Sequence, residues 1–282
     1  MRVAALALAC GLLAGCATSA PLAPGAHYAA LGSSFAAGAG IPPLATDRPE
    51  RCGASQVSYA RLLADRLGLD LTDASCGGAT TAHVLGPWNE LPPQIEAVRL
   101  DTRLVTITIG GNDLAYMGVM FAASCHAGMR DTRLVDPATG ECREPVLPEP
   151  ARVQALEDDL ARLLSEIRVR APRARVVLVQ YVALAGDSDC AAAPLSPEHA
   201  AIAQGVAAAL AEASERAAER AGAEVLAMDE FSANHTPCDP EPWAHGLGDG
   251  FDPAQGAPWH PSREGHAAIA QELARLLNAD EV

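Results

Sequence analysis

Basic clusters are missing from this sequence, and so is any long run of like charge. Lys and Arg number 20 against 35 Asp and Glu, which gives a formal net charge of −15. A nucleic-acid-binding surface needs clustered Lys and Arg to meet the phosphates. The charge balance therefore argues against nucleic acid as a partner. No internal repeat is present, and no segment beyond the N-terminus is long and apolar enough to cross a membrane.

Closely spaced metal ligands are missing as well. No two cysteines form a C-x-x-C pair, which argues against a zinc cluster or a thioredoxin-type redox site. His235, His245 and His266 match no strong zinc-ligand spacing. We therefore expect neither a metal nor any other cofactor.

The N-terminus has the pattern of an export signal. The stretch MRVAALALACGLLAGC carries one Arg and then an apolar run that is too short for an ordinary membrane-spanning helix. Its end, LAGC, resembles the lipobox of bacterial lipoproteins, in which the Cys carries the lipid. The resemblance implies lipid attachment at Cys16 and a membrane-anchored protein of the cell envelope, periplasmic or surface-facing. The alternative is a plain secretory signal cut near Ala20.

These features predict a signal peptide over residues 1–15, a linker over 16–25 and one folded domain over 26–282. Six cysteines remain after the signal, and an even number in an exported chain suggests three disulfides. Counting alone does not choose among the fifteen possible pairings.

Strand-like apolar runs alternate with helical patterns along the rest of the chain. The runs cover residues 28–31, 69–72, 104–109, 176–181 and 224–228. Apolar residues spaced three and four apart predict helices around 153–167, 202–213 and 269–277. The second of these helices has a candidate cap at Ser196, Pro197 at its first position and Gly222 past its end.

This alternation predicts an α/β fold: a three-layer, flavodoxin-like sandwich with a parallel five-stranded sheet. Two long irregular stretches, about residues 36–55 and 230–260, each contain a cysteine. Loops of that length in a compact domain are usually functional or stapled.

Polar groups follow the predicted strands. Ligands of open parallel sheets bind at the carboxyl ends of the strands, which directs attention to these residues. The four segments are GSS at 32–34, SCGGATT at 75–81, GGND at 110–113 and PWHPSREGH at 258–266. A serine needs a base to become a good nucleophile, and a developing oxyanion needs N–H donors. The set is chemically complete for acyl transfer.

In order and spacing these segments resemble the four blocks of the SGNH hydrolases, also called GDSL esterases and lipases, over nearly all of the mature chain. The resemblance implies Ser34 as nucleophile and His260 as general base. It also implies an oxyanion hole formed by the N–H of Ser34, the N–H of Gly78 and the side chain of Asn112. The segments SCGGATT and CDPEPW are most similar to the disulfide-bearing secreted esterases and lipases of actinomycetes.

The resemblance also implies hydrolysis of small-molecule or lipid carboxylic esters. We expect a monomer. The resemblance further implies disulfides in sequence order: Cys52–Cys76, Cys125–Cys142 and Cys190–Cys238. The rival esterase fold needs a G-x-S-x-G elbow, and no segment supplies one. The alternative function is a non-catalytic surface lipoprotein that binds glycan or lipid on the same fold.

Two positions depart from the family pattern. Ser33 replaces the Asp of G-D-S, and Ala257 stands where the Asp of D-x-x-H would be. We expect the backbone carbonyl of Ala257 to orient His260, with Asp249 or Asp252 as the alternative. Trp243 and Trp259 either line an acyl pocket or pack in the core.

Overall fold

The computed structural model describes residues 22–129, 135–186 and 189–278. The expected signal peptide and Cys16 lie outside these residues. One parallel sheet of five strands runs through the molecule in the order β2-β1-β3-β4-β5. The strands are β1 (His27–Gly32), β2 (Asp70–Asp73), β3 (Leu104–Thr108), β4 (Arg175–Val179) and β5 (Glu224–Leu226). The predicted α/β class and strand count are confirmed.

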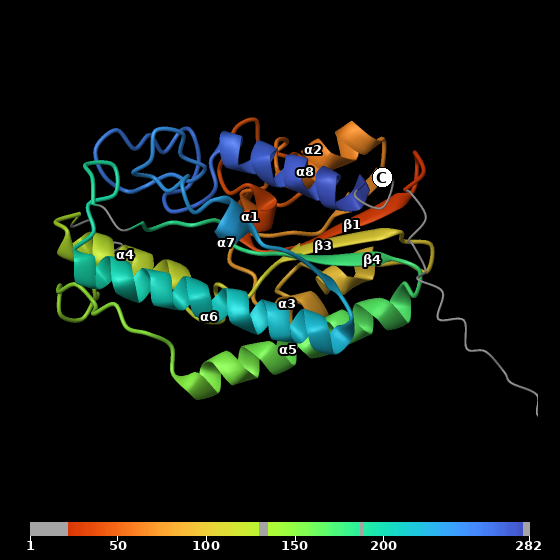
Figure 1. Cartoon of the computed structure of the whole chain (residues 1–282), viewed down its shortest axis with the longest axis horizontal. Coiled ribbons are helices and arrows are strands. Elements are labelled where there is room, and N and C mark those ends of the chain that lie inside the picture. Colours follow the sequence, from red (N-terminus) through yellow and green to blue (C-terminus); the bar gives the residue numbers. More distant parts are fainter. Residues whose placement is uncertain (1–21, 130–134, 187–188, 279–282) are drawn as a thin grey trace, which may run out of the picture.

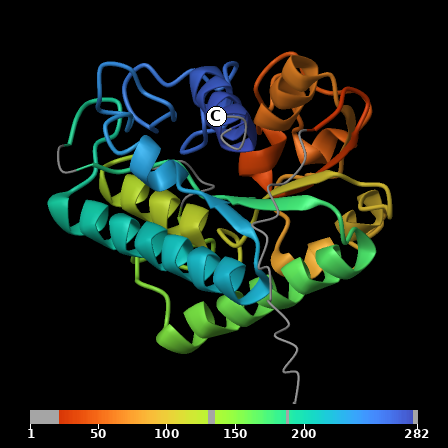
Figure 2. The same cartoon turned by 45° about the vertical axis from the view of Figure 1, so that its right-hand side comes forward.

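Helices cover both faces of this sheet (Figures 1 and 2). One layer holds α1 (Ser34–Ala37), α2 (Tyr59–Leu67) and α8 (Arg263–Asn278). The other holds α3 (Thr81–Leu85), α4 (Tyr116–His126), α5 (Pro150–Arg170) and α6 (Pro197–Ala221). Short helical turns complete the chain: η1 (Glu50–Cys52), η2 (Gln94–Ala97) and α7 (Met228–Phe231). This is the expected three-layer sandwich.

Helix α6 begins and ends where its sequence signals predict. The Ser196 hydroxyl accepts a hydrogen bond from the N–H of His199, and Pro197 occupies the first helical position. Gly222 ends the helix in the left-handed conformation, with a φ of 64°. Helix α4, in contrast, has no clear apolar stripe, because its buried residues lie on most sides of the helix.

Three disulfides join the cysteines in the expected pairs. Cys52–Cys76, Cys125–Cys142 and Cys190–Cys238 have sequence separations of 24, 17 and 48 residues. Loops of this length correspond to a stabilisation of about 3–4 kcal/mol per bridge in the chain-entropy model. The first bridge ties the loop after α1 to the turn after β2. No helix in the described ranges has the length and apolar character to span a bilayer.

Candidate active site

The segment after β1 places two serines in different environments. Gly32 has a φ of 133°, and a Cβ there would lie 2.4 Å from the carbonyl oxygen of Thr108. Only glycine fits this turn, which directs the chain from the strand into α1. Ser33 is 1% exposed, and its Oγ lies 3.5 Å from the Thr108 carbonyl oxygen and from the Tyr181 hydroxyl. Ser33 therefore faces the interior.

Ser34 faces the imidazole of His260. Its Oγ lies 2.8 Å from Nε2 of His260, although the two residues are 226 positions apart in the sequence. Ser34 is partly exposed and opens α1, where the helix geometry leaves its N–H without an intrahelical partner. The side chain can therefore meet both a base and a substrate.

A backbone carbonyl holds the other nitrogen of His260. Nδ1 lies 2.8 Å from the carbonyl oxygen of Pro258, so an Nδ1–H donates to that oxygen and the Nε2 lone pair faces Ser34. The expectation that a carbonyl orients the ring is right in kind, but the expected residue, Ala257, is wrong. Trp259 has a left-handed φ of 57°, which turns the chain so that the ring reaches the residue two positions before it.

The two alternative acids, Asp249 and Asp252, make other hydrogen bonds, the first through its backbone and the second through its carboxylate. Asp252 accepts a hydrogen bond from the N–H of Ala254 at 2.9 Å, and the backbone N–H of Asp249 donates to the carbonyl of Ala191. Within the described structure, neither carboxylate is hydrogen-bonded to His260. A displaced acid therefore does not complete a triad here.

Asp249→Asn and Asp252→Asn are each expected to lower turnover by less than about tenfold, against about 10⁴-fold for the matching change in a triad protease. The reason is that the Pro258 carbonyl already selects the tautomer. Ester hydrolysis by each purified single variant checks this. A loss near the larger figure in a folded variant would show that one of these acids orients the ring.

Burial controls the charge of His260. It lowers the pKa of His260 from 6.5 to about 4, while the Pro258 carbonyl acts in the opposite direction and the nearby His245 adds to the lowering. The imidazole is therefore neutral, and able to take a proton, at neutral pH. Phe35 packs beside it, with 4.8 Å between ring centroids.

The acidic limb of the pH profile follows from this shift. Since only the neutral imidazole can act as a base, kcat/KM should fall as pH drops through about 4, rather than through 6.5. The profile of kcat/KM reports the free enzyme, and circular dichroism at each pH separates loss of activity from unfolding. A limb centred at the ordinary histidine pKa in folded protein would contradict the burial argument.

The turn after β2 and the turn after β3 are bound together. The Asn112 side chain donates from Nδ2 to the Ala79 carbonyl at 2.8 Å, which leaves the second N–H of its amide for another acceptor. Asp113 accepts from the hydroxyl of Thr81 at 2.6 Å. Gly78 is exposed and has a φ of 85°, a conformation that favours glycine. These hydrogen bonds join the two turns that follow β2 and β3.

Tyr181 supports this arrangement and was not singled out from the sequence. Its hydroxyl accepts a hydrogen bond from the N–H of Gly111 at 2.8 Å, next to Asn112. A Cβ at Gly111 would lie 2.7 Å from that hydroxyl, which explains the second glycine of GGND. The only sequence signal was a tyrosine at the carboxyl end of a predicted strand.

The remaining aromatic candidates pack against protein. Trp259 is fully buried, and its Nε1 donates to the hydroxyl of Ser124 on α4 at 2.9 Å. Trp243 stacks on His235, with 4.0 Å between ring centroids.

The buried His266 accepts at Nδ1 from the N–H of Tyr59 at 3.1 Å. Among the described residues, no group of acidic, His or Cys side chains could hold a metal ion.

Known proteins resemble this chain in sequence and in fold. Residues 30–268 match the model of the GDSL-like Lipase/Acylhydrolase family. Lipase 2 of Streptomyces coelicolor is 30% identical over 97% of this chain and 94% of its own length. The extracellular lipase of Streptomyces rimosus superposes with a TM-score of 0.69 at 26% identity, over 88% of this chain and 98% of that one.

A phospholipase A1 from Streptomyces albidoflavus has the same fold, with a TM-score of 0.69 at 23% identity. Three disulfides and an extracellular relative are typical of an exported protein. The chain belongs to the GDSL-like lipase/acylhydrolase family and is a carboxylic ester hydrolase.

Proposed function

We propose that the protein cleaves carboxylic esters through an acyl-enzyme formed on Ser34, with His260 as general base. The observation that carries this assignment is the 2.8 Å contact between Ser34 Oγ and His260 Nε2, with Nδ1 held by the Pro258 carbonyl. The neutral imidazole takes the proton of Ser34 as Oγ attacks the ester carbonyl carbon. The imidazolium then protonates the leaving alcohol, and a water molecule repeats the cycle on the acyl-enzyme.

The oxyanion of each tetrahedral intermediate is stabilised by three N–H donors: the backbones of Ser34 and Gly78 and the amide of Asn112. Support comes from the first turn of α1 and from the Asn112–Ala79 bond, which fixes the direction of the amide. Such donors act because they are already oriented before charge develops.

The Pro258 carbonyl makes this site a Ser–His dyad with a neutral orienter. A carbonyl selects the tautomer as a carboxylate does, but it brings no full charge to stabilise the imidazolium. The site therefore relies more heavily on the oxyanion donors than a site with a carboxylate does.

Hydrolysis of a short-chain nitrophenyl ester by the purified mature protein tests this function. Turnover that depends on Ser34 supports it. Binding of lipid or glycan without turnover would instead support the non-catalytic alternative, which no contact in the site favours.

We further propose that residues 1–15 are removed on export and that lipidated Cys16 anchors residues 26–282 to a membrane through the linker. One acyl chain binds a membrane only marginally, whereas several give stable attachment. Full-length protein should therefore sediment with membranes, and Cys16→Ala should release it or leave the precursor uncut. Wild-type protein that is soluble after fractionation would contradict lipid attachment.

A further inference from the structure

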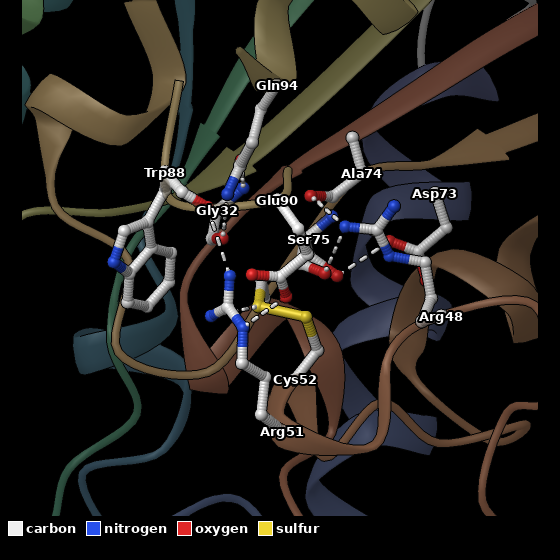
Figure 3. Close-up of a disulfide and its surroundings, with 11 residues drawn as sticks. Gly32, Arg48, Arg51, Cys52, Asp73, Ala74, Ser75, Trp88, Glu90 and Gln94 are labelled. Atoms are coloured by element: carbon white, nitrogen blue, oxygen red, sulfur yellow. Dashed lines mark hydrogen bonds and ion pairs between the residues drawn. A yellow bond between two sulfur atoms is a disulfide. The ribbon is translucent and has the colours of Figure 1, made fainter. Parts of the chain in front are cut away.

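Gln94 is hydrogen-bonded to the end of β1, the strand that leads to Ser34, and lies outside the four segments identified in the sequence. It lies in η2 and is 6% exposed. Its Oε1 accepts from the N–H of Gly32 at 2.7 Å, and its Nε2 donates to the carbonyl oxygen of Gly32 at 3.0 Å. Figure 3 shows both residues beside the Cys52–Cys76 disulfide. One carboxamide thus satisfies both backbone groups of the residue two positions before Ser34.

The N–H of Gly32 is left for Gln94 because the pairing between β1 and β2 ends before this residue. The last pairing of the two strands joins Ala30 and Asp73, followed by a bond from the N–H of Ala74 to the carbonyl of Ala30. Beyond that point the N–H of Cys76 still donates to the carbonyl of Gly32, but the N–H of Gly32 is bonded to Gln94 and not to the chain that follows β2. The carboxamide of Gln94 has one donor side and one acceptor side, as a peptide group does, so its oxygen replaces the missing acceptor for the Gly32 N–H and its nitrogen adds a donor to the Gly32 carbonyl.

The Gly32 carbonyl also connects the nucleophile to the oxyanion turn. It accepts a second hydrogen bond, from the N–H of Cys76 at 3.1 Å. Cys76 is bonded to Cys52 and stands two residues before Gly78. The position of Gly32 therefore sets the distance between Ser34 and the Gly78 turn.

We propose that Gln94 is a positioning residue for ester hydrolysis, which holds Gly32 and thereby aligns Ser34 with His260 and the oxyanion donors. The proposal rests on the function proposed above for Ser34. Catalytic groups must be held within about 0.5 Å of the productive geometry, and a misplacement near 1 Å costs about 10²-fold. Gln94 touches no reacting atom in this role.

Gln94 also lines a cavity of about 250 Å³. The charged or titratable side chains around this cavity are Arg48, Asp73, His83 and Glu96. Arg48 is held by the carbonyls of Ala74 and Ser75 at 3.0 and 3.4 Å, and the hydroxyl of Ser75 donates to Asp73 at 2.6 Å (Figure 3). The space lets residue 94 be replaced by side chains of similar length. A glutamate there would be buried, and burial raises the pKa of a carboxyl.

Two variants separate positioning from simple stability. Gln94→Met keeps the length and removes both bonds, so kcat should fall by about 10- to 100-fold with KM changed by less than about twofold. Gln94→Glu regains the donor only when its carboxyl is protonated. Its kcat, divided by that of the wild type at the same pH, should therefore rise as pH falls from 8 towards 5, roughly the interval over which a buried carboxyl titrates. The same ratio for Gln94→Met should stay flat.

Tyr28→Phe is the matched control. It removes a buried hydrogen bond to Thr106, 2.6 Å long, in the same strand but away from Gly32. It should lower the melting temperature and leave kcat unchanged. If Gln94→Met keeps wild-type kcat, or if the Gln94→Glu ratio is flat with pH, the proposal is wrong. If Gln94→Met fails to fold, the Gln94→Glu ratio alone decides. Ser34→Ala in the same assay tests the proposed function separately. If Ser34→Ala retains turnover, the assignment of Ser34 as nucleophile has failed, whatever the Gln94 variants show.

Discussion

Replacing Ser34 by Ala is expected to lower ester turnover by about 10⁶-fold, the loss seen when a serine protease loses its nucleophile. The reason is that the 2.8 Å contact with His260 Nε2 gives the proton of Ser34 a base, and no other hydroxyl contacts that nitrogen in the described structure. Steady-state hydrolysis of a short-chain nitrophenyl ester measures the loss, with circular dichroism as a check on folding.

Ser33→Ala is the matched control for this experiment, because it removes the neighbouring hydroxyl from the same turn. The Ser33 Oγ makes only long contacts of 3.5 Å with the interior, so turnover should stay close to that of the wild type. If Ser33→Ala abolishes turnover while Ser34→Ala keeps it, the nucleophile is the other serine.

Asn112→Ala is expected to lower kcat by about 10²- to 10³-fold, which is the cost of one side-chain oxyanion donor elsewhere. Because the donor acts on charge that develops only in the transition state, KM should change much less than kcat. The comparison of kcat and KM for one nitrophenyl ester checks both statements.

Thr81→Val serves as the control for Asn112. It breaks the 2.6 Å bond between Thr81 and Asp113, which joins the same two turns, but it removes no oxyanion donor. A loss in Thr81→Val as large as that in Asn112→Ala would mean that Asn112 acts by holding the turns together.

The sequence predicted those parts of the molecule that repeat a local pattern. The five strands appear as apolar runs, and α6 carries both its cap at Ser196 and its stop at Gly222. Ser34 and His260, which lie 2.8 Å apart in the structure, could be named because one follows a strand and the other precedes the last helix in a recognisable segment. The roles of Gly78 and Asn112 in the oxyanion hole stay predictions.

The parts that the sequence could not predict depend on backbone conformation and on distant contacts. The choice of Pro258 over Ala257 follows from the left-handed backbone at Trp259, which a bulky residue rarely adopts. Gln94 acts through bonds to Gly32, 62 residues away in the sequence, and no local pattern marks such a contact. Helix α4 was missed because it is buried on most sides and so lacks an amphipathic stripe.

If Ser34 is the hydroxyl that His260 activates, covalent labelling of the enzyme will identify it as the nucleophile. A fluorophosphonate reacts with an activated serine and stays attached, so peptide mapping by mass spectrometry locates the adduct. We expect one adduct per molecule, on Ser34, formed at neutral pH and lost in His260→Ala. An adduct on Ser33 or any other residue, or unchanged labelling without His260, would show that His260 does not activate Ser34.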